Sequence, residues 1–184
     1  IYAGDIGNAQ YKQTYAELIG DTLDHVPEAS IVFVAGNHDY YSNVSSFSWE
    51  HALKNLYEVA ENWSNVHFLH DEVRLVKGIP IYGGTMWTDL NKGDPYHYYD
   101  AKRGMNDYKY IYLDNKKRLD PSNTRHFHDL FKIDLARYLK SNLPPQVVVS
   151  HHAPTHVPIG NRYHMAALWF CYSAPNVFKD IPEI

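Results

Sequence analysis

The sequence contains a single cysteine, Cys171, among its 184 residues. One cysteine cannot form a disulfide within the chain, which excludes a disulfide-stabilised scaffold and favours a reducing, cytoplasmic environment. Long hydrophobic runs are also missing, because no stretch approaches the ~20 apolar residues that a transmembrane helix needs. We therefore expect a globular protein with no membrane partner.

The sequence also lacks an excess of basic residues. The 17 Lys and Arg residues are outnumbered by 21 Asp and Glu residues, which gives a formal net charge of −4. Extended nucleic acid needs a basic stripe on the protein, so this composition argues against such a partner. It leaves room for a nucleotide or a small phosphoester whose charge is neutralised by metal ions. The sequence also has no Gly-x-Ser-x-Gly elbow and no phosphate-binding Gly-rich loop, which argues against a serine hydrolase or an NTPase.

The composition is that of an ordinary globular domain, with 45% hydrophobic and 21% charged residues. Helix and strand patterns alternate along the chain, which predicts one α/β domain over residues 1–184. The apolar spacing puts Tyr11, Leu18 and Leu130 on buried helix faces. Residues 88–120 have few apolar runs, and we expect them to form a long loop or a small cap that borders the substrate. Helices are expected at residues 10–25, 48–63 and 123–141, and strands at residues 30–35, 66–69, 73–76, 79–83 and 146–150.

Three short hydrophobic runs end abruptly in residues that can bind metal or move protons. Asp5 follows Ala3-Gly4, the cluster Gly36-Asn37-His38-Asp39 follows residues 30–35, and His151-His152 follows residues 147–150. Active sites of α/β proteins lie at the C-terminal ends of buried strands. A carboxylate, an amide and imidazoles form a mixed oxygen and nitrogen set, which indicates a hydrolytic metal centre.

Each signal taken alone has a plainer interpretation. Asp5 and Asn8 can cap the following helix, and Asn-His-Asp is a common composition for a polar turn. A His-His pair is more often a surface feature than a metal site. Successive side chains diverge at the end of a strand, so only one of His151 and His152 is expected to be a ligand. The occurrence of all three signals at strand ends favours the functional interpretation.

The three clusters resemble the middle blocks of the calcineurin-like metallophosphoesterase superfamily. Those blocks are Gly4-Asp5, Gly36-Asn37-His38-Asp39 and Ser150-His151-His152-Ala153-Pro154. Two further segments, residues 82–88 and Met105-Asn106-Asp107-Tyr108, are similar to segments of its small single-domain members. The resemblance implies an α/β fold, an αββα sandwich with mixed β-sheets.

The resemblance also implies a role for each residue of the clusters. Asp5 is similar to a carboxylate that bridges two metals, and Asn37 and His151 are similar to ligands of the second metal. His38 is similar to the histidine that contacts the phosphate and protonates the leaving group, and Asp39 would orient it. We prefer His151 to His152 as the ligand because it is the first residue past the strand.

The remaining residues and the cofactors follow from the same comparison. Asn8 and His152 are expected to support the ligands or to face the substrate. The implied cofactors are two divalent ions, Mn, Fe, Zn or Mg, with manganese favoured. The implied reaction is metal-dependent hydrolysis of a phosphomonoester or phosphodiester, with a small molecule or nucleotide as substrate.

The family's Asp-x-His and Gly-His-x-His blocks are not found in this sequence. The chain begins and stops near the positions where each block should lie, so we expect the fold to be incomplete, with both ends cut from a longer protein. The missing blocks favour an alternative, a non-catalytic binding module with the phosphoesterase fold. The intact cluster of Asn37, His38 and Asp39 opposes that alternative. Among enzymes, a nuclease is the other alternative, and the oligomeric state stays open.

Overall fold

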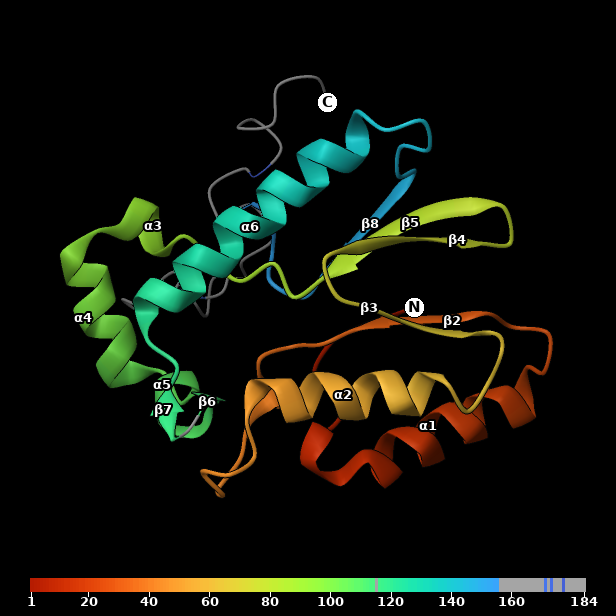
Figure 1. The fold of residues 1–184 in the computed structure, drawn as a ribbon, viewed down its shortest axis with the longest axis horizontal. Helices are drawn as coiled ribbons and strands as arrows, with labels where there is room; N and C mark the ends of the chain where they lie inside the picture. Colours follow the sequence, from red (N-terminus) through yellow and green to blue (C-terminus); the bar gives the residue numbers. More distant parts are fainter. Residues whose placement is uncertain (115, 156–170, 172, 174–176, 178–184) are drawn as a thin grey trace.

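The structure, a computed structural model, describes residues 1–114, 116–155, 171, 173 and 177. Two three-stranded sheets face each other in it, with helices on the outer side of each (Figure 1). The first sheet is parallel, in the order β1-β2-β3. The second is mixed, in the order β4-β5-β8, because β4 is antiparallel and β8 parallel to β5. The strands are β1 (Tyr2–Ala3), β2 (Ile31–Val34), β3 (Val66–Leu69), β4 (Glu72–Val76), β5 (Ile79–Gly84), the paired β6 (Tyr112–Asp114) and β7 (Lys117–Arg118), and β8 (Val147–Ser150).

The helices begin at capping signals in the sequence. Ser48 forms a capping box with His51 at the start of α2, and Asp120 caps α6, which has Pro121 in its first turn. Helices α1 and α2 lie outside the first sheet, and α6 lies outside the second (Figure 1). The helices are η1 (Ala9–Tyr11), α1 (Lys12–His25), η2 (His38–Tyr40), α2 (Trp49–Ala60), α3 (Leu90–Gly93), α4 (Pro95–Gly104), α5 (Asp107–Tyr110) and α6 (Pro121–Leu139).

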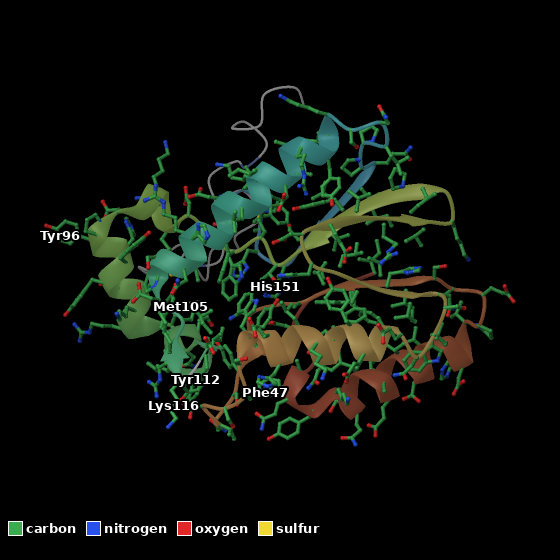
Figure 2. All side chains as sticks on the ribbon, in the orientation of Figure 1. Phe47, Tyr96, Met105, Tyr112, Lys116 and His151 are labelled. Atoms are coloured by element: carbon green, nitrogen blue, oxygen red, sulfur yellow. The ribbon has the colours of Figure 1, made fainter. Side chains whose placement is uncertain are left out.

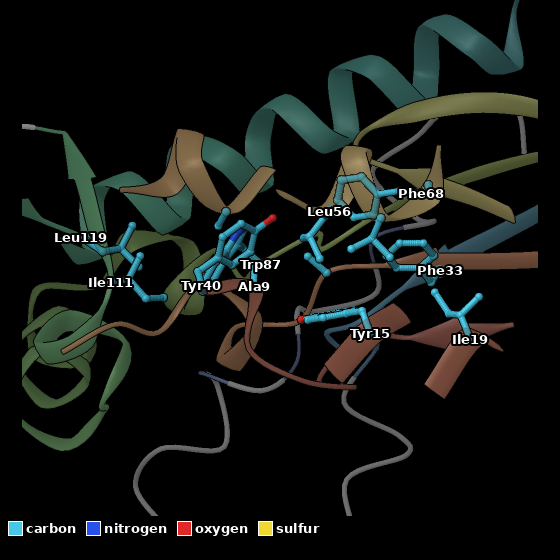
Figure 3. Close-up of a cluster of buried hydrophobic side chains, with 14 of the residues drawn as sticks. Ala9, Tyr15, Ile19, Phe33, Tyr40, Leu56, Phe68, Trp87, Ile111 and Leu119 are labelled. Carbon is cyan, nitrogen blue, oxygen red and sulfur yellow. The ribbon is translucent and has the colours of Figure 1, made fainter. Parts of the chain in front are cut away.

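Three hydrophobic clusters fill the spaces between these four layers. Strand β2 is buried on both faces, because Phe33 packs in the cluster with α1 and α2, and Val34 packs in the cluster between the sheets. Figure 3 shows the cluster on the helix side. Tyr82 of β5 packs against Phe131 and Leu135 of α6. The expected αββα sandwich is therefore confirmed. The cluster between the sheets consists of Val32, Val34, Leu69, Val76, Ile81 and Val149.

The segment of residues 88–120 differs from the expected long loop. It contains α3, α4, α5 and the β6–β7 hairpin. Helix α4 begins at Asp94, whose carboxylate accepts hydrogen bonds from the two backbone N–H groups of its first turn. Only Ala101 of α4 is buried and Tyr96 is 82% exposed, so its sequence has no apolar stripe to indicate a helix. The role of this segment as a cap over a substrate stays a prediction.

Three residues that the apolar spacing placed on buried faces are exposed. Tyr11 is 59%, Leu18 36% and Leu130 39% exposed. The residues next to them in the helical pattern, among them Tyr15, Ile19 and Phe131, fill the core instead. No helix within the described part of the chain is long and apolar enough to cross a membrane.

The C-terminal ends of β1, β2 and β8 lie at one edge of the sandwich. Parallel pairing brings the ends of β1 and β2 together, and β8 supplies the corresponding end from the second sheet. Figure 2 shows His151 at this edge, which faces the segment that contains Met105 and Tyr112. The residues expected to form the site therefore converge here from both sheets.

Candidate metal centre

Two glycines allow the strand ends to approach each other closely. Gly4 has a φ of +91°, and a Cβ there would lie 2.5 Å from His151 Nδ1. A Cβ on Gly36 would lie 2.1 Å from Asp5 Oδ1. Asp5 itself has a φ of +55°, a conformation that Asp adopts more readily than most residues. These turns bring Asp5, at the end of β1, next to the loop that follows β2.

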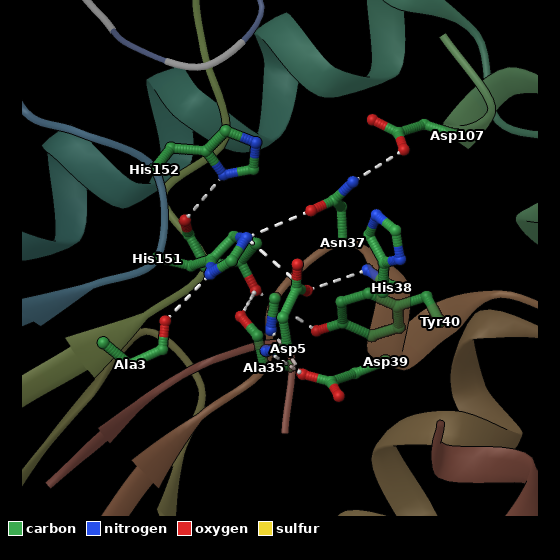
Figure 4. A network of polar contacts seen from close by, with 12 residues as sticks. Ala3, Asp5, Ala35, Asn37, His38, Asp39, Tyr40, Asp107, His151 and His152 are labelled. Atoms are coloured by element: carbon green, nitrogen blue, oxygen red, sulfur yellow. Dashed lines mark hydrogen bonds and ion pairs between the residues drawn. The ribbon is translucent and has the colours of Figure 1, made fainter. Parts of the chain in front are cut away.

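The side chains of Asp5, Asn37 and His151 meet at this edge (Figure 4). His151 Nε2 lies 3.0 Å from Asn37 Oδ1 and 3.5 Å from Asp5 Oδ1. Asp5 and Asn37 come from the first sheet, and His151 comes from the second. The structure thus brings together the three residues expected to be metal ligands, and their role as ligands remains a prediction.

The hydrogen bonds around these atoms determine where the protons lie. His151 Nδ1 is 2.8 Å from the carbonyl oxygen of Ala3, which can only accept, so Nδ1 carries the proton. With one proton on the ring, Nε2 then has a free lone pair. Asn37 donates from Nδ2 to Asp107 Oδ1 at 2.8 Å, so its Oδ1 points to His151. Three atoms with lone pairs therefore face one another, and a cation or an additional proton is needed between them.

The spacing of these atoms fits a divalent ion. Metal bonds of about 2.0–2.2 Å place neighbouring ligands about 3.0–3.5 Å apart. A histidine ligand commonly donates its other N–H to a carbonyl, as His151 does to Ala3. Within the described ranges, no group of three or more His, Cys, Asp or Glu side chains could hold a metal. The third donor here is an amide, which lies outside these four residue types.

His38 lies next to the three donors, and it is exposed. Its backbone N–H donates to Asp5 Oδ1 at 3.0 Å, and its ring stacks on Tyr41 with 4.5 Å between the ring centroids. Asn8 supports the same loop, since its Nδ2 donates to the carbonyl oxygen of Tyr41 at 2.8 Å. Asn8 Oδ1 accepts from the backbone N–H of Gln10, which makes it the cap of η1.

The contacts of Asp39 differ from the one expected with His38. Its buried carboxylate accepts four hydrogen bonds from groups at the ends of β1 and β2 and in α1. Burial raises the pKa of Asp39, and the hydrogen bonds from Tyr15 and Gly36 act against that rise. A carboxylate has about four acceptor positions, and the four donors match that number. Asp39 thus clamps the two strand ends together, and its expected role toward His38 stays a prediction. The four donors are Asp5 N at 3.0 Å, Gly7 N at 3.2 Å, Gly36 N at 2.6 Å and Tyr15 OH.

His152 lies in the core and does not face the substrate edge. Its ring is 5% exposed, 5.2 Å from the ring of Trp87, and its Nδ1 is 3.2 Å from the carbonyl oxygen of Thr85. Burial is the main cause, and the proximity of His151 a smaller one, that lowers the pKa of His152 to about 3. The ring is therefore neutral, and it connects the ends of β5 and β8.

Sequence reasoning missed three residues that hold this arrangement. Tyr15 donates to Asp39, Tyr41 stacks on His38, and Asp107 accepts from Asn37. Burial raises the pKa of Asp107, and the hydrogen bonds from Tyr41 and Asn37 act against the rise. The Met-Asn-Asp-Tyr segment was one signal for Asp107, although the resemblance gave it no role.

The family assignment agrees with this geometry. The family model of calcineurin-like phosphoesterases matches residues 1–171, and the chain belongs to this family. The family supports a phosphoesterase function in general, and its members generally bind divalent metals. The resemblance inferred from the strand-end clusters is thereby confirmed.

A curated relative is a viral protein. The uncharacterized protein L509 of Acanthamoeba polyphaga mimivirus is 26% identical to this chain over 159 residues. The match covers 82% of this chain and 53% of the viral protein. The chain therefore spans about half the length of this relative.

Proposed function

We propose that the protein hydrolyses a phosphoester with divalent ions held by Asp5, Asn37 and His151. The observation that supports the proposal is that His151 Nε2 lies 3.0 Å from Asn37 Oδ1 and 3.5 Å from Asp5 Oδ1. Divalent ions, when bound, supply the positive charge that activates water and neutralises phosphate oxygens. The proposal includes two ions, with manganese favoured. Donors other than these three residues would complete the site of the second ion.

Each residue of the candidate site would have its own role in the hydrolysis. The amide of Asn37 adds an oxygen donor without adding negative charge beside a phosphate. The exposed ring of His38 would give a proton to the leaving oxygen, and its stack on Tyr41 fixes the plane of the ring. Gly4 and Gly36 keep the strand ends close enough for this arrangement.

A pocket of about 360 Å³ adjoins Tyr41 and is open to solvent. Its lining contains tyrosines, amides and a serine, and no charged side chain. A neutral lining with aromatic faces suits the uncharged part of a small phosphoester or the base of a nucleotide. We assign the leaving group to this pocket. The lining residues are Asn8, Gln10, Tyr11, Tyr41, Ser42, Asn43 and Tyr110.

The test combines a metal count with a hydrolysis assay. The protein is loaded with manganese and desalted, its metal content is measured by elemental analysis, and p-nitrophenyl phosphate and bis(p-nitrophenyl) phosphate are offered as a monoester and a diester. We expect bound manganese and hydrolysis of at least one ester, both abolished in Asp5→Asn. Bound manganese without hydrolysis would favour the binding-module alternative. Absence of both would refute the proposal.

A further inference from the structure

Asp107 is a buried carboxylate that contacts the candidate site from a distant part of the chain. It is 2% exposed, begins α5, and lies 70 residues from Asn37 in the sequence. Its Oδ1 accepts a hydrogen bond from Asn37 Nδ2 at 2.8 Å and a second from the Tyr41 hydroxyl (Figure 4 shows the first). The loop that follows η2 is also fixed to the end of α5, because Ser42 N donates to the carbonyl oxygen of Tyr110 at 2.8 Å.

The first of these contacts decides which end of the Asn37 amide faces His151. The two ends of an amide have almost the same shape, so only its hydrogen-bond partners determine its orientation. A carboxylate accepts and does not donate, so Asp107 holds Nδ2 and turns Oδ1 to His151. Without Asp107, the opposite orientation would be favoured, because Nδ2 could then donate to the lone pair of His151 Nε2. In that orientation Asn37 offers no oxygen to a cation, and the lone pair of His151 Nε2 is taken up by a hydrogen bond.

The second contact extends the same control to His38. The Tyr41 hydroxyl donates to Asp107, and the Tyr41 ring lies against the imidazole of His38 with an angle of 20° between the rings. One carboxylate therefore fixes both the amide of Asn37 and the aromatic surface that supports His38. We propose that Asp107 is a positioning residue, which keeps Asn37 Oδ1 available to a cation and Tyr41 beneath His38. The inference rests on the proposed function, and it assigns a task to a segment that is remote in sequence.

The test compares three variants with a matched control. Asp107→Ala removes the acceptor, and we expect a 10–100-fold loss of manganese affinity, measured by electron paramagnetic resonance of the free ion. Asp107→Asn keeps an oxygen that can rotate to accept from Asn37 and Tyr41, so its affinity should stay within about threefold of the wild type. Asp100→Asn removes an exposed carboxylate of α4 and should change nothing.

The third variant separates the two contacts of Asp107. Tyr41→Phe keeps the ring but loses the hydroxyl, so manganese affinity should be retained while kcat falls. An equal loss of affinity in Asp107→Asn and Asp107→Ala would indicate an effect of charge and would overturn the proposal. Unchanged affinity in Asp107→Ala would overturn it as well. If Asp107→Ala does not fold, a loss of affinity beyond about tenfold in the isosteric Asp107→Asn would also overturn the proposal.

A metal-free measurement separates this inference from the proposed function. In spectra of the apo wild type, the side-chain amide protons of Asn37 should point to Asp107 and show no nuclear Overhauser contact with the ring protons of His151. In Asp107→Ala such a contact should appear, because the rotated amide turns Nδ2 to His151. This contact in Asp107→Ala, for a protein whose wild type binds no manganese, would refute the metal centre and support the orienting role. Its absence, for a protein whose wild type binds manganese, would refute the orienting role alone.

Discussion

At the scale of single residues, His38 stands apart from the buried groups around it. Its ring is exposed, and its closest described partner is the aromatic face of Tyr41. The ring does not belong to the three converging donors, so His38→Ala should leave manganese affinity unchanged. Turnover should fall by about 100-fold or more for an alkyl ester and far less for p-nitrophenyl esters, because a good leaving group needs no proton. Equal losses with both kinds of ester, in steady-state assays, would contradict the role of proton donor.

Asp5 contributes the only carboxylate of the donor set. Asp5→Asn keeps the size of the side chain and an acceptor for the backbone N–H of His38, which Oδ1 binds at 3.0 Å. The variant should therefore fold, yet lose the negative charge that attracts a cation. We expect manganese affinity to fall by more than the 10–100-fold that supporting residues cause, and activity to fall with it. Calorimetric titration measures the affinity. An unchanged affinity would place the metal elsewhere.

The sequence predicted the proximity of some residues of the site but not the contacts of others, for a physical reason. Asp5, Asn37 and His151 follow strand ends, and the C-terminal ends of strands converge, so their proximity could be inferred. The contacts of Asp39 were not foreseen, because its hydrogen-bond donors are not its neighbours in sequence, and its role toward His38 stays a prediction. Its four donors are backbone groups and Tyr15, which no side-chain pattern reveals. Asp107 was not assigned a role because its contact spans 70 residues and is set only by the tertiary fold.

At the scale of elements, Asp39 joins the ends of β1 and β2. Its carboxylate satisfies three backbone N–H groups and one hydroxyl, and the bonds from Gly36 and Tyr15 are buried. Asp39→Ala should lower the free energy of unfolding by about 3–5 kcal/mol, because each unsatisfied group costs about 1–3 kcal/mol and water re-enters in part. Urea unfolding measures the change. Asp24→Ala, at an exposed position of α1, is the control and should stay within about 0.5 kcal/mol. A similar small change in Asp39→Ala would refute the clamp.

The connection between β3 and β4 contains a half-buried carboxylate, Asp71, whose Oδ1 is buried. Among the described residues, nothing hydrogen-bonds to its Oδ1. Burial, with a smaller contribution from the negative charge of Asp134, raises the pKa of Asp71 from its ordinary value of 3.8 to about 7. Because the pKa of Asp71 is higher in the folded state than in the unfolded chain, the unfolded chain loses this proton at a lower pH. The contribution to stability is therefore complete below about pH 4 and is lost as the pH rises to about 7.

Asp71→Asn tests this pH dependence. The variant cannot ionise, so it should become more stable than the wild type as the pH rises from 5 to 8. The advantage should reach about 1–3 kcal/mol at pH 8, because a shift of one pKa unit corresponds to about 1.4 kcal/mol and partial exposure reduces it. Urea unfolding of the metal-free protein at both pH values measures it. An advantage that is constant with pH would mean that Asp71 does not titrate in this range.

The helices and strands show which sequence patterns predict an element correctly and which do not. The expected strands at residues 66–69 and 79–83 correspond to β3 and β5, because buried strands are short apolar runs between turns. Helix α4 was missed because an exposed helix buries one small residue, Ala101, and has no apolar period. Its signals were the Asp94 cap and Pro95, which a composition rich in Asp, Lys and Tyr obscured.

At the scale of the whole molecule, the candidate site joins two sheets that pack against each other through apolar side chains. Val34, Leu69 and Val149 are among the side chains packed between the sheets. Asp5 and Asn37 belong to the first sheet, and His151 belongs to the second, so an ion bound by all three would link the two halves of the sandwich. Such an ion binds the folded state and not the unfolded chain, whose ligands are scattered over about 150 residues.

Manganese should therefore stabilise the whole fold. At 100 times the dissociation constant, the gain is about 2.7 kcal/mol, which for a chain of this size raises Tm by about 5–10 °C. Scanning calorimetry with and without manganese measures the shift. His151→Ala removes the only donor from the second sheet and should abolish the shift, while His126→Ala, at an exposed position of α6, should keep it in full. If His151→Ala kept the shift, the ion would be held within one sheet, and the link between the two sheets would have to be abandoned.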